Sequence, residues 1–197
     1  MTSQSVPTRP VLIDQDMTSA NFSERDFRDA LGMFATGVSI VTADCGGERV
    51  AATIGSFSSV SLDPPLVLFM IAKSSRAFSA WSSVGQFAIN ILDRAQGELS
   101  TKFAKALTNK WENVHPLPGA VTDSYLLPGA LAWFECEKYC QFDGGDHLII
   151  LGKVQAIARR SGANATPLVF FNGHYRSLMP LELDNMPHEE SMWIYGW

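Results

Sequence analysis

The segment from residue 130 to residue 160, ALAWFECEKYCQFDGGDHLIILGKVQAIARR, constrains the fold more than any other part of the sequence. It contains two long, largely apolar runs on either side of Gly144-Gly145, and a glycine pair suits the tight turn of a hairpin. Two long strands joined by such a turn pair in antiparallel fashion. The segment therefore predicts a fold built on an antiparallel sheet.

Strand patterns outnumber helix patterns in the rest of the chain. The expected strands are VSIVTA (38–43), RVAATIGSF (49–57), LVLFMIA (66–72), QFAINIL (86–92) and PLVFFNGHYRSL (167–178). The third is apolar on both faces and should lie centrally. The expected helices are 23–37, capped by Ser23 and ended by Gly37, then 74–85 and 97–107. Short helices among many strands argue against a parallel βαβ fold and favour an antiparallel barrel with peripheral helices.

The composition fits one compact domain. A chain of 197 residues is long enough for one well-buried core, which we expect over residues 23–180, with a flexible leader at 1–22 and a tail at 181–197 that packs on the domain or on a dimer partner. The net charge is −5 and no basic stripe is present, so nucleic acid is not expected as a partner. No run approaches the ~20 apolar residues of a membrane span, so we expect a cytoplasmic protein with no membrane partner.

The cysteines do not suggest a metal centre or a disulfide framework. Cys45, Cys136 and Cys140 are an odd number, and the four histidines are scattered along the chain. No dense set of metal ligands therefore appears, and we expect free thiols and no metal.

Four serines crowd the stretch SFSSVS, residues 56–61. If the strand continues through them, Ser56 and Ser58 point to one face while Phe57 and Ser59 point to the other. Such a strand end is either a solvated edge or a surface that lines a ligand. Small hydroxyl groups leave room for a flat heteroaromatic ring and can hydrogen-bond to its carbonyls and nitrogens.

Two further stretches carry groups suited to ligand binding. KSSRAF, from Lys73 to Phe78, places Arg76 and two serines at the expected start of a helix, where an anion is favoured; the alternative is a helix cap beside a solvated arginine. GGDH places His147 at a strand entrance beside Asp146, either as a structural residue or at the mouth of a barrel. No G-x-G-x-x-G motif follows a strand, and neither G-x-S-x-G nor a P-loop is present.

Together these segments resemble a known family. TGVSIVTA, AATIGSFSSVSLDPPLVLFMIA, SSRAF, FAINIL, LSTKFA, ALAWFECE, GGDHLIILGKV and PLVFFNGHYRSL occur in an order and spacing similar to the short-chain NAD(P)H:flavin oxidoreductases, the reductase components of two-component flavin monooxygenases. The resemblance runs from about Phe27 to Leu178. It implies an FMN-binding split β-barrel with a Greek-key-like antiparallel topology, a homodimer with flavin near the subunit interface, FMN or FAD as cofactor, and NADH or NADPH as cosubstrate.

The resemblance also implies roles for individual residues. The residues that match flavin-binding positions of the family are Thr53, Ser56, Phe57, Ser58 and Ser59 for the ring and ribityl chain, Ser75 and Arg76 for the phosphate, and Asn90, Phe103 and Tyr175 elsewhere around the flavin. His147 matches the histidine beside the nicotinamide and is the expected catalytic residue. Two positions depart from the family: Ala51 replaces a glycine and Ala77 a threonine, which implies a tighter backbone approach and one phosphate donor fewer.

The implied function is a flavin reductase that transfers hydride from NAD(P)H to flavin and supplies a partner monooxygenase. One alternative is a flavoprotein reductase that passes electrons from bound flavin directly to another acceptor, such as a corrinoid cobalt. A second alternative is a split-barrel protein that binds flavin or heme without catalysis, because fold alone does not fix function.

Overall fold

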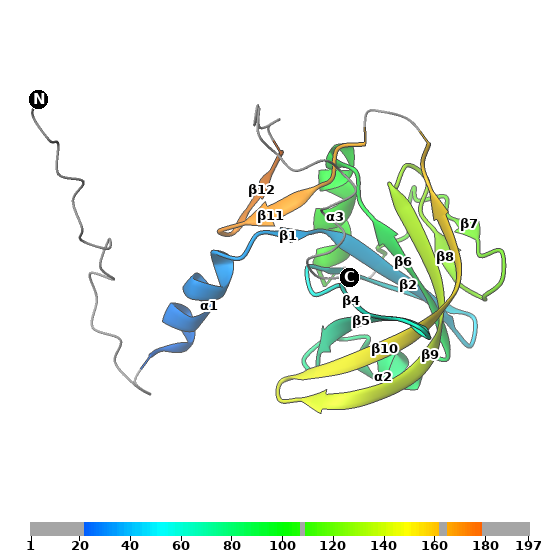
Figure 1. Cartoon of the computed structure of the whole chain (residues 1–197), viewed down its shortest axis with the longest axis horizontal. Coiled ribbons are helices and arrows are strands. Elements are labelled where there is room, and N and C mark those ends of the chain that lie inside the picture. The colour runs from blue at the N-terminus through cyan, green and yellow to red at the C-terminus, as the bar shows by residue number, and fades with distance from the viewer. Residues whose placement is uncertain (1–21, 107–108, 162–164, 179–197) are drawn as a thin grey trace, which may run out of the picture.

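In the computed structural model, the structure describes residues 22–106, 109–161 and 165–178. These residues form a curled antiparallel sheet with short helices around it (Figure 1). The predicted mainly β, antiparallel fold class is confirmed. The predicted leader and tail fall almost entirely outside the described residues. Among the helices of the described residues, none has the length and apolar character needed to cross a membrane.

One seven-stranded sheet dominates, in the order β3-β2-β6-β9-β10-β5-β4. Its strands are β2 (Ser39–Cys45), β3 (Glu48–Ile54), β4 (Ser58–Leu62), β5 (Pro65–Ala72), β6 (Gln86–Ile91), β9 (Ala132–Gly144) and β10 (His147–Arg159). The short strands are β1 (Thr36–Gly37), β7 (Leu117–Pro118), β8 (Tyr125–Leu126), β11 (Val169–Phe171) and β12 (His174–Arg176). The helices are α1 (Glu24–Gly32), α2 (Phe78–Ser83), the 3-10 turn η1 (Arg94–Gln96) and α3 (Gly97–Ala104).

The predicted long hairpin is the pair β9 and β10, and its tip is fixed against the end of β5. The backbone N–H of Lys73 donates to the Asp146 carbonyl at 2.8 Å, and the Lys73 ammonium pairs with the Asp143 carboxylate at 2.5 Å. In the register of β10 with β5, His147 lies opposite Ala72. The hairpin thus delivers His147 to a defined place beside β5.

The chain turns a corner at residues 55–57, where the sequence predicted a continuous strand. β3 ends at Ile54 and β4 starts at Ser58, at the opposite edge of the sheet. The Ser56 hydroxyl accepts from the Met70 N–H at 3.0 Å and donates to the Met70 carbonyl at 3.3 Å. At this point a side chain, and not the backbone, hydrogen-bonds to β5, so the strand ends. The same bonds hold the end of β3 close to β5, near the opposite edge of the sheet. The predicted alternation of faces therefore does not extend from Ser56 to Ser59.

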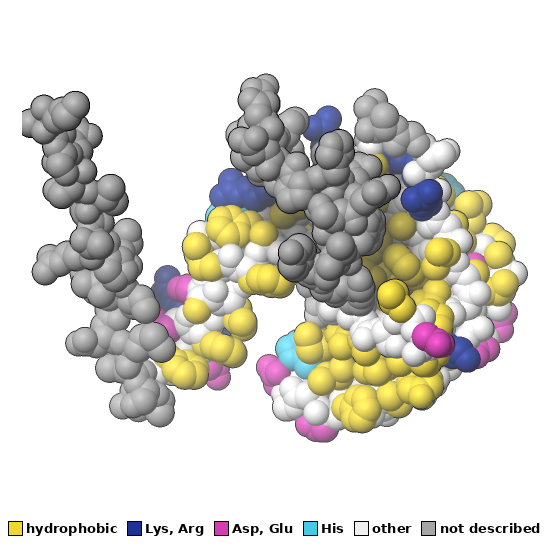
Figure 2. Space-filling model, viewed as in Figure 1, with side chains coloured by type: hydrophobic (Ala, Val, Ile, Leu, Met, Phe, Trp, Pro, Cys, Tyr) yellow, Lys and Arg dark blue, Asp and Glu magenta, His cyan; other side chains and the backbone are white. Residues whose placement is uncertain are grey.

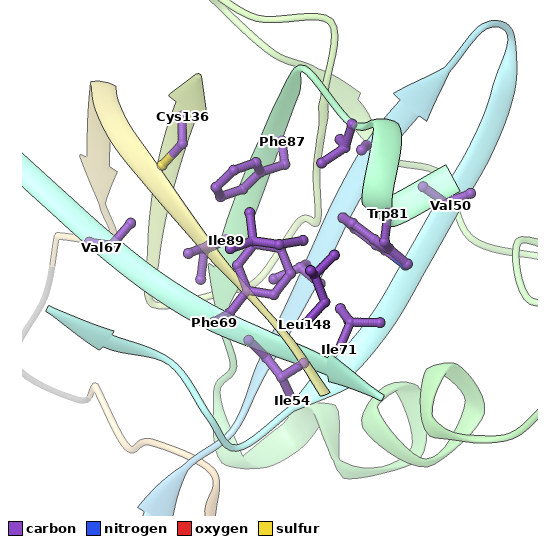
Figure 3. Packing of buried hydrophobic residues seen from close by; sticks show 14 residues of the cluster. Val50, Ile54, Val67, Phe69, Ile71, Trp81, Phe87, Ile89, Cys136 and Leu148 are labelled. Atoms are coloured by element: carbon purple, nitrogen blue, oxygen red, sulfur yellow. The ribbon is translucent and has the colours of Figure 1, made fainter. Parts of the chain in front are cut away.

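The main core fills the inside of the curled sheet (Figure 3). Phe69 of β5 packs edge-on against Trp81 and Phe87, at ring distances of 5.6 and 5.0 Å, and all three are fully buried. Gly152 lies beneath this cluster, where an added Cβ would come within 2.3 Å of Phe87 Cζ. The core therefore requires a residue without a side chain at this point of β10.

Three predicted elements differ in detail. The first helix starts after the predicted Ser23 cap but ends at Gly32, because Thr36 and Gly37 pair with β11 instead. The predicted last strand is a hairpin, since the chain reverses at Asn172-Gly173 between β11 and β12. β5 pairs on both sides but lies next to the sheet edge, and not centrally as predicted.

Candidate functional site

A cleft of about 790 Å³ lies beside β3, at the edge of the sheet. One wall is the whole of β3 and its extension to Ser56; the others are residues 70–72 and 74–77, the end of α3 with Ala106, Lys110 and Trp111, and the hairpin tip. The predicted site residues that the structure brings to this cleft are Thr53, Ser56, Ser75, Arg76, Phe103 and His147. These residues come from four separate parts of the sequence.

The wall formed by β3 presents free backbone groups. β3 is an edge strand, paired with β2 on one side only. The indole N–H of Trp111 donates to the Arg49 carbonyl at 3.0 Å, which shows that this carbonyl points away from β2. In an antiparallel strand every second residue points its N–H and C=O the same way, so Ala51 and Thr53 offer a donor and an acceptor each. This edge suits a planar ring with alternating hydrogen-bonding groups.

Helix α3 is fastened to β3 and carries Phe103. The Thr53 hydroxyl donates to the Ser100 carbonyl of α3 at 2.7 Å. Phe103 is almost fully buried and packs edge-on against Trp111 at a ring distance of 5.0 Å. Ala51, which replaces the expected glycine, belongs to the same hydrophobic cluster as Phe103. Its methyl group therefore contributes to the packing of α3 against β3.

The stretch predicted to bind phosphate lies on the opposite side of the cleft. Arg76 is exposed, and its guanidinium donates to the Ala106 carbonyl at 3.2 Å. The Ser75 hydroxyl accepts from the Ala77 N–H at 3.3 Å. The helix predicted from residue 74 begins only at Phe78 and has six residues with no side-chain cap. Arg76 and Ser75 therefore lie in a turn, not at a serine-capped helix start.

His147 reaches the cleft from the hairpin tip and is held by its neighbour. Its Nδ1 lies 2.7 Å from the Asp146 carboxylate. The hydrogen bond and charge of His147 lower the pKa of Asp146. With Nδ1 bonded to Asp146, the ring orientation is restricted and Nε2 is left for another partner.

Three of the predicted site residues lie near the corner but outside the cleft. Phe57 packs against the main core, with its ring 5.6 Å from that of Phe134. Ser58 and Ser59 belong to β4 on the far edge of the sheet. The structure does not bring these three side chains to the cleft because the corner at residues 55–57 separates β4 from β3.

Two other predicted residues also lie elsewhere. Asn90 is fully buried; its amide donates to the Ile40 carbonyl at 2.9 Å and accepts from the Leu127 N–H at 2.7 Å. It therefore joins β2 and β6 to the loop that follows β8. The Tyr175 hydroxyl lies 2.8 Å from that of Ser100, and Tyr175 lines a smaller hollow along α3 and not the main cleft.

Sequence reasoning missed Arg49, Lys110 and Trp111, which also line the cleft. The Lys110 ammonium donates to the Phe103 carbonyl at 2.8 Å, and burial lowers its pKa. No motif marks this segment. The only signal was a lysine next to a tryptophan within an otherwise polar loop.

Neither a metal centre nor a disulfide is formed by the described residues. They contain no group of three or more histidine, cysteine, aspartate or glutamate side chains placed to hold a metal ion. Cys45, Cys136 and Cys140 are free thiols. Burial and the neighbouring Glu135 raise the pKa of Cys136 to about 12, so this thiol is not a nucleophile at neutral pH.

Comparison with known proteins identifies the family. Residues 31–179 match the flavin reductase like domain. The chain belongs to the flavin reductase family. A probable flavin reductase of Rhizobium meliloti is 43% identical over 149 residues, which are 75% of this chain but only 47% of the relative. This chain therefore spans about half the length of that relative.

Two other members of the flavin reductase family match over most of their length. An NADH-dependent FMN reductase, SmoA, of Agrobacterium fabrum is 42% identical over 155 residues, 78% of this chain and 85% of the relative. The crystal structure of a nitrilotriacetate monooxygenase component B homologue from Mycobacterium thermoresistibile has a TM-score of 0.77 at 34% identity, and covers 85% of this chain and 93% of that one. The predicted split-barrel fold and the predicted class, an NAD(P)H-dependent flavin oxidoreductase, are confirmed.

Proposed function

We propose that this flavin reductase passes reducing equivalents from NADH or NADPH to FMN or FAD in the cleft beside β3. The observation that carries the proposal is the convergence of Ser56, Arg76 and His147 on one cleft. These residues are far apart in sequence, and the family resemblance assigned them to the ring, the phosphate and the nicotinamide.

The groups that line the cleft fit a flavin. The free edge of β3 offers backbone donors and acceptors to a planar ring, and Arg76 offers a cation to a phosphate. Among the described residues that line the cleft, Glu48 is the only carboxylate, so these residues offer an anionic ligand little repulsion. When bound, the flavin supplies the hydride-accepting chemistry.

The chain itself supplies position. The Ser56 hydroxyl is held by two hydrogen bonds to Met70, and the His147 ring by one to Asp146. Side chains fixed in this way lose little freedom when a ligand binds. We propose that His147 orders the nicotinamide, because correct placement of two reactants removes much of the entropic barrier to their reaction.

We propose that the reduced flavin serves a separate oxygenase. Support comes from the similar protein from Mycobacterium thermoresistibile, which is named as a monooxygenase component. The three free thiols fit a reducing compartment such as the cytoplasm, in agreement with the location predicted from the sequence.

We also propose that the protein is a homodimer, because two apolar surfaces are exposed among the residues that the structure describes. Helix α1 has no buried residue, and Phe27 and Leu31 on its apolar side are 53% and 57% exposed. A nine-residue helix is marginal without packing. The second surface is the outer face of the sheet, where Met70, Ile149 and Phe142 align across β5, β10 and β9.

A second copy can cover both surfaces, since the apolar side of an amphipathic helix and an apolar sheet face are complementary. Figure 2 shows hydrophobic side chains along α1 and over the β9–β10 part of the barrel on the same side of the molecule. Met70 also lines the cleft, so a dimer formed here would place the cleft beside the partner.

Light scattering tests the dimer. We expect a mass of twice 21.6 kDa, and a shift toward the monomer in the variant that combines Phe27→Asp with Leu31→Asp. The control Arg25→Ala, on the same helix, should keep the dimer mass. A mass near that of one chain for the unmodified protein would overturn the proposal.

The activity is tested by mixing the purified protein with NADH or NADPH and with FMN or FAD, and following the loss of nicotinamide absorbance. We expect turnover that depends on both the flavin and the pyridine nucleotide. Flavin binding without nicotinamide oxidation would instead support the binding-only alternative.

A further inference from the structure

The cleft extends along the whole of β3, beyond the end where Ser56 and His147 lie. Trp111 bonds to Arg49 near the start of β3, whereas Ser56 lies two residues beyond its end. At ~3.4 Å per residue in an extended chain, these points are roughly 20 Å apart. Ser56, assigned to the flavin ring, and His147, assigned to the nicotinamide, therefore line a different part of this continuous cleft from Lys110 and Trp111.

Two cations meet at the C-terminal end of α3. Arg76 donates to the Ala106 carbonyl and Lys110 to the Phe103 carbonyl. These carbonyls lie three residues apart, so the two positive groups are held by the same short stretch. Within the described part of the chain, no carboxylate lies within 4 Å of either cation. Lys110 is also partly withdrawn from water, so its charge is costly unless an anion joins it.

We propose that Arg76 and Lys110 hold the two phosphates of a diphosphate, and that the flavin which this protein binds preferentially is FAD. This inference rests on the proposed flavin reductase function and adds the choice of flavin. The single phosphate of FMN needs one cation, whereas the diphosphate of FAD brings anionic oxygens to both. Trp111, which is half-buried, then provides aromatic surface beside the adenosine half, since purines stack on such side chains.

The test is an equilibrium titration of FAD, FMN and riboflavin, followed by flavin fluorescence without pyridine nucleotide. The unmodified protein should bind FAD about tenfold more tightly than FMN, the value of one charge-assisted contact. Lys110→Met, which keeps the aliphatic stem, should weaken FAD binding about tenfold and change FMN binding by less than about twofold. Lys110→Arg should retain the preference for FAD.

A matched control separates a local contact from net charge. Lys105→Met removes the same charge from an exposed lysine in the same stretch, and it should leave the binding of both flavins unchanged. Equal melting temperatures of the Lys110 and Lys105 variants show that neither acts through folding.

Three outcomes would overturn the inference: FMN binding at least as tight as FAD binding, equal weakening of both flavins by Lys110→Met, or an effect of that variant only on the KM for NADH, which would assign Lys110 to the pyridine nucleotide. In each case turnover with FMN would leave the proposed function standing. Absence of turnover with every flavin would instead reject the function, and the inference with it.

Discussion

The interior of the barrel and the cleft beside β3 share strands, but they differ in one respect. Side chains in the interior contact other residues of the chain on all sides, whereas groups in the cleft are left open to a ligand. In the interior, Phe69, Trp81 and Phe87 are fully buried and contact one another edge-on. In the cleft, backbone groups on the free edge of β3 point away from the sheet, and Arg76 is exposed beside a carbonyl.

This difference separates residues that determine stability from residues that determine binding. When a side chain makes all its contacts within the chain, its replacement lowers the free energy of unfolding of the protein. A group left open at the edge of a sheet contributes little to folding, so its replacement should change ligand binding or rate instead. The following substitutions test that separation, beginning with the largest expected effect.

Gly152→Ala should be the most destabilising. The added Cβ would lie 2.3 Å from Phe87 Cζ and 2.9 Å from Cys136 Cβ, and neither neighbour can move freely in a packed core. We expect a loss of about 3 kcal/mol in the free energy of unfolding, the upper part of the range for overpacking. Denaturant unfolding measures it. Gly97→Ala, where an added Cβ meets nothing within 4 Å, is the control; equal effects of the two would contradict this account of the core.

Glu135→Gln tests a buried carboxylate whose hydrogen-bond partners all belong to this chain. The buried carboxylate accepts from the backbone N–H groups of Ala120, Val121 and Thr122 and from the Thr122 hydroxyl. An amide cannot accept all four bonds, so we expect a loss of about 2–3 kcal/mol at neutral pH. The exposed Glu137→Gln on the same strand should cost much less.

The same carboxylate makes stability depend on pH. Burial raises the pKa of Glu135, but the hydrogen bonds from residues 120–122 outweigh it and leave the pKa below its ordinary value of 4.5. Its contribution is therefore complete above pH 4.5 and is lost as the pH falls through the lower folded pKa. The stability difference between the unmodified protein and Glu135→Gln should shrink over that acidic range; a constant difference would show that the charge is not responsible.

The sequence was sufficient for the parts of the fold that depend on local pattern. The 132–159 hairpin followed from apolar runs around a glycine pair, and the start of α1 from the Ser23 cap, which the structure shows as a reciprocal pair with Asp26. The corner at Ser56 was not predictable, because it depends on a bond to Met70, fourteen residues away. An alternating pattern predicts a strand, but it does not show where a side chain takes the place of backbone groups in hydrogen bonding to a neighbouring strand.

The residue types of the site drew attention to Arg76 and His147, but they left a structural alternative open for each. The fold decides the position of both residues, because it brings them to one cleft. Asn90 was assigned to the flavin by resemblance, but the structure shows that its amide is occupied within the sheet. Lys110 was missed because no motif marks its segment, and only the fold brings it to the same cleft as Arg76.

Arg76→Ala should change binding and not stability. If the guanidinium meets the flavin phosphate, its loss should weaken FMN binding by ~1.5–3 kcal/mol, the scale of a charge-assisted hydrogen bond. Riboflavin has no phosphate and should be nearly unaffected. The measurement is a titration of both ligands, and equal weakening of the two would show that Arg76 acts through folding.

His147→Ala should have the smallest effect on free energy and the most specific one on function. The ring is partly exposed, and among the described residues its one hydrogen-bond partner is Asp146 at 2.7 Å. Its removal should therefore leave the unfolding curve and the flavin affinity unchanged. The cofactor supplies the reactivity and the histidine only placement. We therefore expect flavin reduction by NADH, measured by stopped flow, to slow ~10- to 100-fold, about 1.4–2.7 kcal/mol, without being abolished. Loss of flavin or precipitation of the variant would show that His147 has a structural role. An unchanged rate would show that it takes no part in hydride transfer.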